Sequence, residues 1–327
     1  MQKDPQYYIQ GILDGNRLML SRTITLIESA LPAHQEMART IIDQLLPYTG
    51  QSVRLGITGV PGAGKSTYID SFGGFLTKSG HRVAVLAIDP SSARSGGSIL
   101  GDKTRMFNLS VNPDAFIRPS PSGGTLGGVA RKTRETMLAC EAAGFDVIII
   151  ETVGVGQSET AVASMVDFFL VLMIAGAGDE LQGIKKGILE VADAIVINKA
   201  DGDNIPRAEL ARREYETALH LLTPHNQDWS PPVLTCSGLK QTGLEHIWQT
   251  IARHRSIMIA NGGHDIRRKE QALDWMHFLL DEGLRSWFYH HPDIINELPH
   301  LTRKIQNHAM SPTAAASMLL NHLEKFS

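Results

Sequence analysis

The sequence predicts an α/β protein in which a mainly parallel sheet is flanked by helices, with helical extensions at both ends. From residue 51 to about residue 260, apolar runs of strand length alternate with segments of helical periodicity. This is the pattern of strand–helix units that wind around a parallel sheet. The runs expected to be strands are 53–58, 82–88, 145–150, 168–174, 194–197 and 233–236. A chain of 327 residues is long enough for one such domain and additional helices.

Helical patterns precede and follow the expected sheet. Residues 1–50 form an N-terminal helical extension and residues 51–260 form the central domain. The Asn-Gly-Gly break at 261–263 begins a C-terminal helical arm, residues 261–327. Apolar residues recur in this arm every three or four positions, at Leu273, Met276, Leu280, Leu284 and Trp287. Such a stripe needs a covering surface, which either the central domain or a second copy of the chain can provide.

A glycine-rich loop follows the first expected strand. Residues 59–66 read G-V-P-G-A-G-K-S, which fits the phosphate-loop pattern G-x-x-x-x-G-K-[ST], and a helix is expected from about Lys65. The backbone N–H groups of such a loop and the helix N-terminus cradle phosphates. Lys65 can reach the β- and γ-phosphates, and Ser66 can bind Mg²⁺. The residues expected to contact the nucleotide here are Gly59, Val60, Pro61, Gly62, Ala63, Gly64, Lys65, Ser66 and Thr67. The sequence therefore predicts a P-loop NTPase.

An Asn-Lys-Ala-Asp tetrapeptide at residues 198–201 follows another apolar run, at the kind of strand end where open α/β sheets bind ligands. The carboxylate of Asp201 can accept hydrogen bonds from N1–H and the exocyclic amine of guanine, whereas adenine would leave it unpaired. The stem of Lys199 can cover one face of the base, and Asn198 can tie this loop to the phosphate loop. The expected ligands are therefore GTP and GDP rather than adenine nucleotides.

Acidic residues after two further strands are candidates for holding Mg²⁺. Glu151 can hold a water of the Mg²⁺ shell, while the N–H of Gly154 can meet the γ-phosphate. Asp89 and Asp102 lie at the two ends of a Ser- and Gly-rich segment that suits a loop ordered by Mg²⁺·GTP. For both aspartates, capping of a turn or helix is the alternative role. The predicted metal-binding set is Ser66, Asp89, Asp102 and Glu151.

The residue after the switch glycine predicts slow hydrolysis. GTPases that hydrolyse well often carry a water-orienting Gln at this position, but this chain has Val155, which cannot orient water. We therefore expect slow turnover by the isolated protein and faster turnover when a partner completes the site. Lys185 and Lys186 can supply positive charge to it, unless they form a solvated helix face. The catalytic candidates are Lys65, Glu151 and Lys185.

Composition argues against several other classes of protein. The net charge is −3, so the chain lacks the basic field of a general nucleic-acid binder. Cys140 and Cys236 match neither a disulfide framework nor a zinc motif, and the 13 histidines are scattered. No apolar run reaches membrane-spanning length, and the N-terminus lacks the features of a leader peptide. We expect a cytoplasmic protein with no nucleic-acid or membrane partner.

Four long runs carry a resemblance to a known family. Residues 61–67, 87–92, 151–159 and 178–187 resemble the MeaB/ArgK family, which comprises P-loop GTPases of the SIMIBI class that associate with methylmalonyl-CoA mutase. The resemblance implies a homodimeric GTPase that acts as a chaperone of this adenosylcobalamin-dependent mutase. Such a chaperone gates cofactor loading and protects the mutase, with GTP binding and hydrolysis as its switch.

The same resemblance implies roles for individual positions. The positions that match the magnesium and switch machinery are Asp89, Asp102 and Glu151. Lys185 matches a switch loop used in partner-stimulated hydrolysis, and the C-terminal arm matches a dimerisation element. The positions that match the base-contacting segment are Ser237, Gly238 and Leu239. Many family members have Ser-Ala before the Leu, but glycine still presents its backbone N–H, so we expect contact with the base to survive.

Other functions remain open from the residues alone. An ATP-dependent kinase of an amino-acid transport binding protein, a role historically attached to the family's name, would show ATP preference and phosphate transfer to protein. A nickel-type metallochaperone GTPase would bind nickel or zinc stoichiometrically, although the sequence shows no ligand cluster. A scaffold that holds GTP without hydrolysing it is less compatible with Lys65, Ser66 and Glu151 together.

Overall fold

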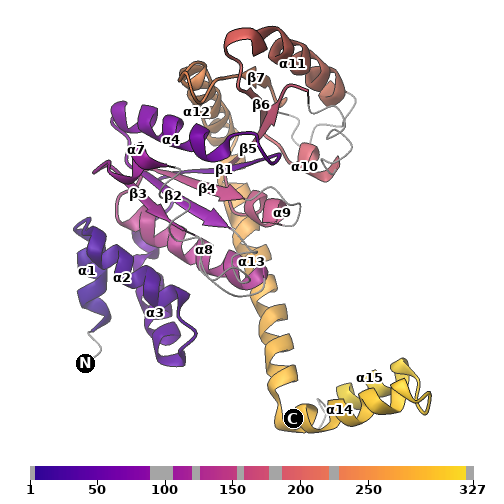
Figure 1. Cartoon of the computed structure of the whole chain (residues 1–327). Helices are drawn as coiled ribbons and strands as arrows, with labels where there is room; N and C mark the ends of the chain where they lie inside the picture. The colour runs from indigo at the N-terminus through magenta and orange to yellow at the C-terminus, as the bar shows by residue number, and fades with distance from the viewer. Residues whose placement is uncertain are drawn as a thin grey trace. The chain divides into compact units, whose positions relative to one another are not determined.

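The computed structural model describes residues 4–88, 106–119, 126–152, 158–176, 186–220 and 228–321. Within these residues, seven strands form one sheet in the order β3-β2-β4-β1-β5-β6-β7, and every neighbouring pair is parallel (Figure 1). The strands are β1 (Val53–Gly59), β2 (Val83–Ile88), β3 (Ala115–Arg118), β4 (Val147–Thr152), β5 (Phe168–Ile174), β6 (Ala194–Asn198) and β7 (Val233–Thr235). The predicted α/β fold with a parallel sheet is therefore confirmed.

The sequence located six of these strands and missed β3. Each apolar run that we expected to be a strand forms one, and the ends differ by two residues at most. β3 contains only four residues, lies at the edge of the sheet and is half-buried at Ile117 and Arg118. An edge strand of this length carries no long apolar run, so the pattern that identified the buried strands could not identify it.

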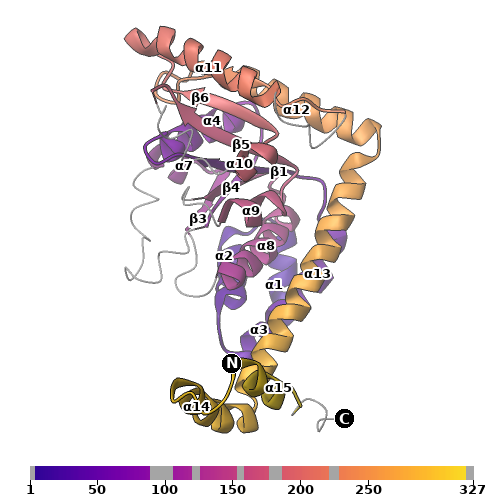
Figure 2. The same ribbon diagram turned by 90° about the vertical axis from the view of Figure 1, so that its right-hand side faces the viewer.

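Helices cover both faces of the sheet. In Figures 1 and 2, α4 lies on one face and α8 lies on the other, and α8 packs on β2 and β4 and on α2 and α3. The helices that precede the C-terminal segment are α1 (Pro5–Leu13), α2 (Arg17–Glu28), α3 (Pro32–Leu45), α4 (Lys65–Lys78), α7 (Phe107–Ser110), α8 (Leu126–Ala142), α9 (Ser158–Ala163), α10 (Lys186–Glu190), α11 (Ile205–His220) and α12 (Leu244–Ala260). Short 3₁₀ helices occur at Leu46–Tyr48 and Gly202–Asn204.

The N-terminal helices share the hydrophobic core of the sheet. Leu20, Ile24 and Ile41 are fully buried in the same cluster as the side chains of β1 and β4. Asn16 caps α2 by accepting hydrogen bonds from the N–H groups of the next turn, and Arg118 of β3 pairs with Glu28 at the other end of α2. One compact unit, Met1–Arg268, accordingly contains both these helices and the sheet.

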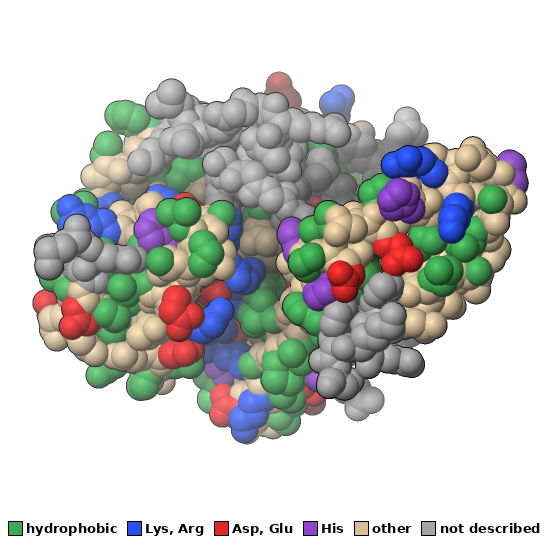
Figure 3. Space-filling view, turned by 90° about the horizontal axis from the view of Figure 1, so that it is seen from below, with side chains coloured by type: hydrophobic (Ala, Val, Ile, Leu, Met, Phe, Trp, Pro, Cys, Tyr) green, Lys and Arg blue, Asp and Glu red, His purple; other side chains and the backbone are tan. Residues whose placement is uncertain are grey.

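The second compact unit is Lys269–Ser327 and is helical in its described residues. It contains most of α13 (Gly263–His290), which begins in the first unit, and two further helices, α14 (Pro292–Gln306) and α15 (Pro312–Asn321). A small core of Ile294, Leu301, Ala315 and Leu319 joins α14 to α15. The stripe that begins at Leu273 and ends at Trp287 is 46–62% exposed in the single chain. Figure 3 shows the molecule from below, with groups of hydrophobic side chains exposed between charged ones.

Within the described residues, no helix combines the length and the apolar character that crossing a membrane requires.

Candidate nucleotide-binding site

The phosphate loop connects β1 to α4 at the carboxyl edge of the sheet. β1 ends at Gly59, whose φ is +154°, and a Cβ atom at this position would lie 2.2 Å from the carbonyl oxygen of Leu172 in β5. Only glycine permits so close an approach between the two strands. α4 begins at Lys65, directly after Gly64, which has a left-handed φ of +82°. The loop therefore brings a helix N-terminus and a lysine to the strand ends, as a phosphate site requires.

Lys65 is held by the loop that contains it. Its Nζ donates hydrogen bonds to the carbonyl oxygens of Gly59 at 2.8 Å and Val60 at 3.4 Å. Burial lowers the pKa of the Lys65 ammonium, and the negative charges of Glu151 and Glu159 oppose this shift. Carbonyl oxygens are weaker partners for an ammonium group than phosphate oxygens. Lys65 is thus placed where an incoming phosphate group can take over its hydrogen bonds.

Glu151 and Ser66 form a second polar contact beside the loop. The Oγ of Ser66, in the first turn of α4, donates to Oε1 of Glu151 at 3.3 Å. Glu151 lies near the end of β4 and is buried. A hydroxyl and a carboxylate are hard oxygen ligands of the type that Mg²⁺ prefers, and Mg²⁺ commonly uses few protein ligands beside phosphate oxygens and waters. The two side chains therefore fit the expected Mg²⁺ site.

Two features near this site were missed in the sequence. Glu159 in α9 is buried and close enough to Lys65 to influence its pKa. The hydroxyl of Thr152 donates to that of Thr58 at 2.7 Å, so a buried hydrogen bond joins β4 to β1 one residue from Glu151. The run 151–159 offered a signal for Glu159, since it contains both acidic residues. The threonine pair depends on strand register, which local sequence does not reveal.

The Asn-Lys-Ala-Asp segment lies at the end of β6, beside the phosphate loop. The Nδ2 of Asn198 donates to the carbonyl oxygen of Ala63 at 2.8 Å, which is the tie between the two loops that the sequence predicts. The aliphatic stem of Lys199 passes near Gly64. The hydroxyl of Ser237 donates to Oδ2 of Asp201 and accepts from the N–H of Lys240. The Asp201 carboxylate is thereby oriented beside the segment expected to contact the base.

Four of the predicted site residues lie outside the described residues, namely Asp89, Asp102, Gly154 and Lys185. Val155, on which the expectation of slow hydrolysis depends, also lies outside them. The described residues bring together most of the remaining candidates, which are the phosphate loop, Glu151, Asn198, Lys199, Asp201, Ser237 and Gly238. Thr67 follows the loop in the first turn of α4, and the side chain of Leu239 is exposed. Among the described residues, no group of three or more His, Cys, Asp and Glu side chains is arranged to hold a metal ion.

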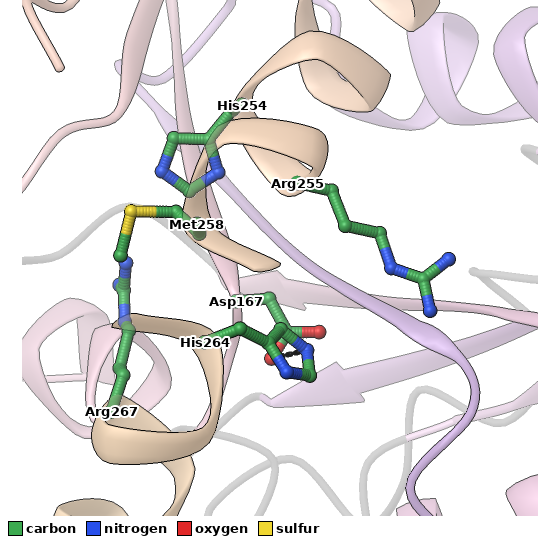
Figure 4. A pocket seen from close by; sticks show the side chains of 6 residues that line it. All are labelled: Asp167, His254, Arg255, Met258, His264 and Arg267. Atoms are coloured by element: carbon green, nitrogen blue, oxygen red, sulfur yellow. Dashed lines mark ion pairs between the residues drawn. The ribbon is translucent and has the colours of Figure 1, made fainter. Parts of the chain in front are cut away.

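A small polar pocket lies at the opposite, amino edge of the sheet. Figure 4 shows His254, Arg255 and Met258 of α12 and His264 and Arg267 of α13 around Asp167, which precedes β5. Asp167 accepts two hydrogen bonds from Arg268, at 2.8 and 2.7 Å, and one from the N–H of Arg54. Burial alone would raise the pKa of Asp167, but the hydrogen bonds and charge of Arg268 outweigh it and lower the pKa. The contacts of Asp167 with Arg268 and Arg54 anchor the first turns of α13 beside β1. The sequence did not predict them.

The histidines of this pocket are not fully satisfied by protein groups. Nε2 of His254 and Nε2 of His264 are buried without a hydrogen bond, and each lies 3.8 Å from an aspartate oxygen, of Asp193 and Asp167 respectively. Burial lowers the pKa of His254, which packs edge-on against Phe168 and Trp229.

The parallel sheet brings a phosphate loop with Lys65 and Ser66 to the same edge as Glu151 and the segment with Asp201. This arrangement is the one by which P-loop GTPases bind the phosphates and read the guanine base, and it defines the class of the protein. A family model described as "Methylmalonyl Co-A mutase-associated GTPase MeaB" matches residues 20–293. The chain therefore belongs to the MeaB family of GTPases.

Individual relatives agree with this assignment. The chain is 58% identical over 309 residues to a "Putative GTPase" of Caulobacter vibrioides, with 94% of each chain covered. It is 45% identical over 320 residues to the "Methylmalonic aciduria type A homolog, mitochondrial" of Mus musculus, with 95% of this chain and 77% of the mouse protein covered. A crystal structure of a "LAO/AO transport system kinase" superposes with a TM-score of 0.80 at 39% identity, covering 99% of both chains. The protein is a GTPase that binds guanine nucleotides.

Proposed function

We propose that this GTPase is a chaperone of methylmalonyl-CoA mutase, in which GTP binding and hydrolysis gate the loading of adenosylcobalamin and protect the mutase. The observation that carries the proposal is the extent of the family match. It runs over residues 20–293 and so includes most of α2, the whole sheet and all of α13, beyond the phosphate loop alone. The name of the mouse relative, which refers to methylmalonic aciduria, adds support.

The contacts of Lys65 support a switch that responds to the nucleotide. In the present structure its Nζ is bonded to two carbonyl oxygens of the loop, and phosphate oxygens would replace them because an ammonium group binds a negatively charged oxygen more strongly than a neutral carbonyl oxygen. The loop N–H groups and the N-terminus of α4 then face the phosphates. The segments that contain Asp89, Asp102, Gly154 and Lys185 would convey the state of the nucleotide to the partner.

Mg²⁺ belongs to this proposal as the companion of GTP. Bound beside the phosphates, it neutralises the charge that develops on the β- and γ-oxygens. Ser66 and Glu151 would hold it, directly or through water, because their oxygens already lie 3.3 Å apart. Asp89 and Asp102 are the additional candidates from the sequence.

The stripe on α13 supports a homodimer. Leu273, Met276, Leu280, Leu284 and Trp287 are at least 46% exposed in the single chain. A row of large apolar side chains on one helix marks an interaction surface when it stays uncovered. A second copy of the chain would cover it with an identical row, as twofold symmetric interfaces do. The C-terminal arm is thus our candidate for the dimerisation element.

The proposal is tested by steady-state GTP turnover of the purified protein, alone and with purified methylmalonyl-CoA mutase, together with size-exclusion chromatography of the mixture. We expect slow turnover alone, because Val155 replaces a water-orienting Gln, and a clear rise with the mutase. The Lys65→Ala variant, mixed with the same mutase, should show no rise. Turnover that the mutase leaves unchanged, with no complex on the column, would contradict the chaperone role and leave the GTPase assignment intact.

A kinase is the second candidate, because the superposable crystal structure is described as a transport system kinase. Nucleotide preference and phosphate transfer distinguish the two functions. A chaperone GTPase should prefer GTP and release inorganic phosphate. A kinase of a binding protein should leave the γ-phosphate on a protein acceptor, which radiolabelled nucleotide would detect.

A further inference from the structure

Gly238 lies in an unusually close contact between the base-contacting segment and the phosphate-binding helix. A Cβ atom at Gly238 would lie 3.0 Å from Cα and 3.2 Å from the backbone nitrogen of Tyr68 in α4. Tyr68 is fully buried and belongs to the first turn of the helix that begins at Lys65. The φ of Gly238 is not in the left-handed region, so a side chain here would be limited by the space beside Tyr68 and not by backbone conformation.

Both backbone polar groups of Gly238 are used to hold this contact. Its carbonyl oxygen accepts a hydrogen bond from Oγ of Ser71 on α4 at 2.6 Å. Its N–H donates to Oδ1 of Asn198 at 3.0 Å, and the other end of the same amide donates to the carbonyl oxygen of Ala63 in the phosphate loop. Gly238 is thereby fixed both to α4 and, through Asn198, to the phosphate loop.

The neighbour of Gly238 controls the carboxylate expected to read guanine. Ser237 donates its hydroxyl to Asp201, and its Oγ also accepts from the N–H of Lys240. A displacement of Gly238 would therefore move Ser237 and, with it, the partner that orients Asp201. Because the ribose joins the base to the phosphates covalently, one nucleotide can satisfy both half-sites only when their separation is correct.

We propose that Ser71 is a positioning residue that sets the distance between the guanine-reading segment, residues 237–240, and the phosphate-binding helix α4. Its hydroxyl holds the backbone of Gly238 against the backbone of Tyr68. The proposal rests on the base-reading role of Asp201 and deepens the nucleotide site. It makes no use of the mutase, so it and the chaperone proposal can fail separately.

The test compares equilibrium binding of GDP and IDP to Ser71→Ala and to the unmodified protein. IDP lacks the exocyclic amine that Asp201 reads, so the ratio of the two dissociation constants measures base reading independently of the phosphates. Losing one positioning hydrogen bond should weaken GDP binding by about fivefold to tenfold. IDP binding should weaken less, so that the preference for GDP declines. Ser71→Thr, which keeps a hydroxyl, should restore it.

Ser79→Ala is the matched control, because Ser79 lies at the end of the same helix and its hydroxyl bonds to the carbonyl oxygen of Phe75 within that helix. It should bind both nucleotides like the unmodified protein. Thermal unfolding of each variant separates a loss of fold from a loss of positioning. An unchanged GDP-to-IDP ratio in folded Ser71→Ala would overturn the proposal. If Asp201→Asn, measured in parallel, also leaves the ratio unchanged, the base-reading role on which the proposal rests fails too.

Discussion

The two edges of the sheet use charged residues in opposite ways. At the carboxyl edge, Lys65 is bonded to carbonyl oxygens of its own loop, and Ser66 makes a rather long contact with Glu151. At the amino edge, Asp167 and Arg268 make two hydrogen bonds to each other, at 2.8 and 2.7 Å. The first set of contacts can be exchanged for those of a ligand, whereas the second pairs buried charges permanently.

The amino edge extends this pairing into a connected group of charges. Arg268 also donates to the carbonyl oxygens of Gly50 and Ser52, next to β1. Glu141 of α8 pairs with Arg54 of β1 at 2.7 Å and accepts from the N–H of Gly50. Burial would raise the pKa of Glu141, but Arg54 outweighs it and lowers the pKa. The comparison indicates that stability is concentrated at one edge of the sheet and ligand exchange at the other.

The largest expected effect is on stability, from Asp167→Ala. Removing the carboxylate leaves the partly buried Arg268 and the N–H of Arg54 without their partner, and breaking a buried ion pair in this way costs about 3–5 kcal/mol. Urea denaturation should show this loss while GDP affinity stays unchanged. Asp265→Ala, an exposed aspartate in the first turn of α13, should change stability by no more than about 0.5–1 kcal/mol. A loss below about 1 kcal/mol for Asp167→Ala would contradict the anchoring role.

The next effect is on turnover, from Lys65→Ala. Losing one positive group at the developing phosphate charge should reduce GTP turnover by about 10²–10³-fold. Unfolding free energy should change little, because the hydrogen bonds of Lys65 in the free protein run to carbonyl oxygens of its own loop. The control is Lys78→Ala in the exposed last turn of the same helix. If Lys65→Ala instead keeps full turnover, the phosphate loop is wrongly assigned.

Base selection should respond to Asp201→Asn. The amide reverses the donor and acceptor pattern of the carboxylate, so the preference for GTP over XTP should fall by about 10²-fold or more. Competition binding with the two nucleotides measures the preference directly. Asp203→Asn, two residues away in the exposed 3₁₀ turn, serves as the control. An unchanged preference for GTP would remove Asp201 from the base-reading role.

The smallest effect is a pH dependence that originates at the amino edge. Burial lowers the pKa of His254. Between this lowered pKa and the ordinary pKa near 6.5, His254 is protonated in the unfolded chain but neutral in the folded protein. Stability from His254 is therefore present above about pH 6.5 and is lost as the pH falls through that window. His254→Gln should flatten the unfolding free energy between about pH 5 and 7.

His246→Gln, on the exposed face of the same helix, should keep the pH dependence of the unmodified protein. The carboxylates of Asp167 and Glu141, whose pKa values are lowered, act at lower pH: their contribution is lost as the pH falls below the ordinary carboxyl range near 4. The pH range in which His254 acts and the lower range in which the two carboxylates act can therefore be separated in one pH titration. A parallel pH dependence in His254→Gln and the unmodified protein would show that His254 does not carry the effect.

The two edges also differ in how far the sequence could predict them. The carboxyl edge consists of short motifs, since residues 59–66 and 198–201 each place their chemistry within one loop after a strand. The amino edge is built from residues far apart in the chain: Asp167 and Arg268 are separated by 101 positions and Arg54 and Glu141 by 87. No local pattern records such pairs. The contact between Ser71 and Gly238 spans 167 positions and was missed for the same reason.

The central claim is that a ligand replaces the contacts of Lys65 at the carboxyl edge, while the ion pair at the amino edge persists. Crystal structures with GDP, and with Mg²⁺ and a non-hydrolysable GTP analogue, test it most directly. The account predicts that Nζ of Lys65 leaves the carbonyl oxygens of Gly59 and Val60 and contacts phosphate, while the bonds between Asp167 and Arg268 and between Asn198 and Ala63 persist. Lys65 still bonded to its own loop with nucleotide present, or a broken pair of Asp167 and Arg268, would contradict it.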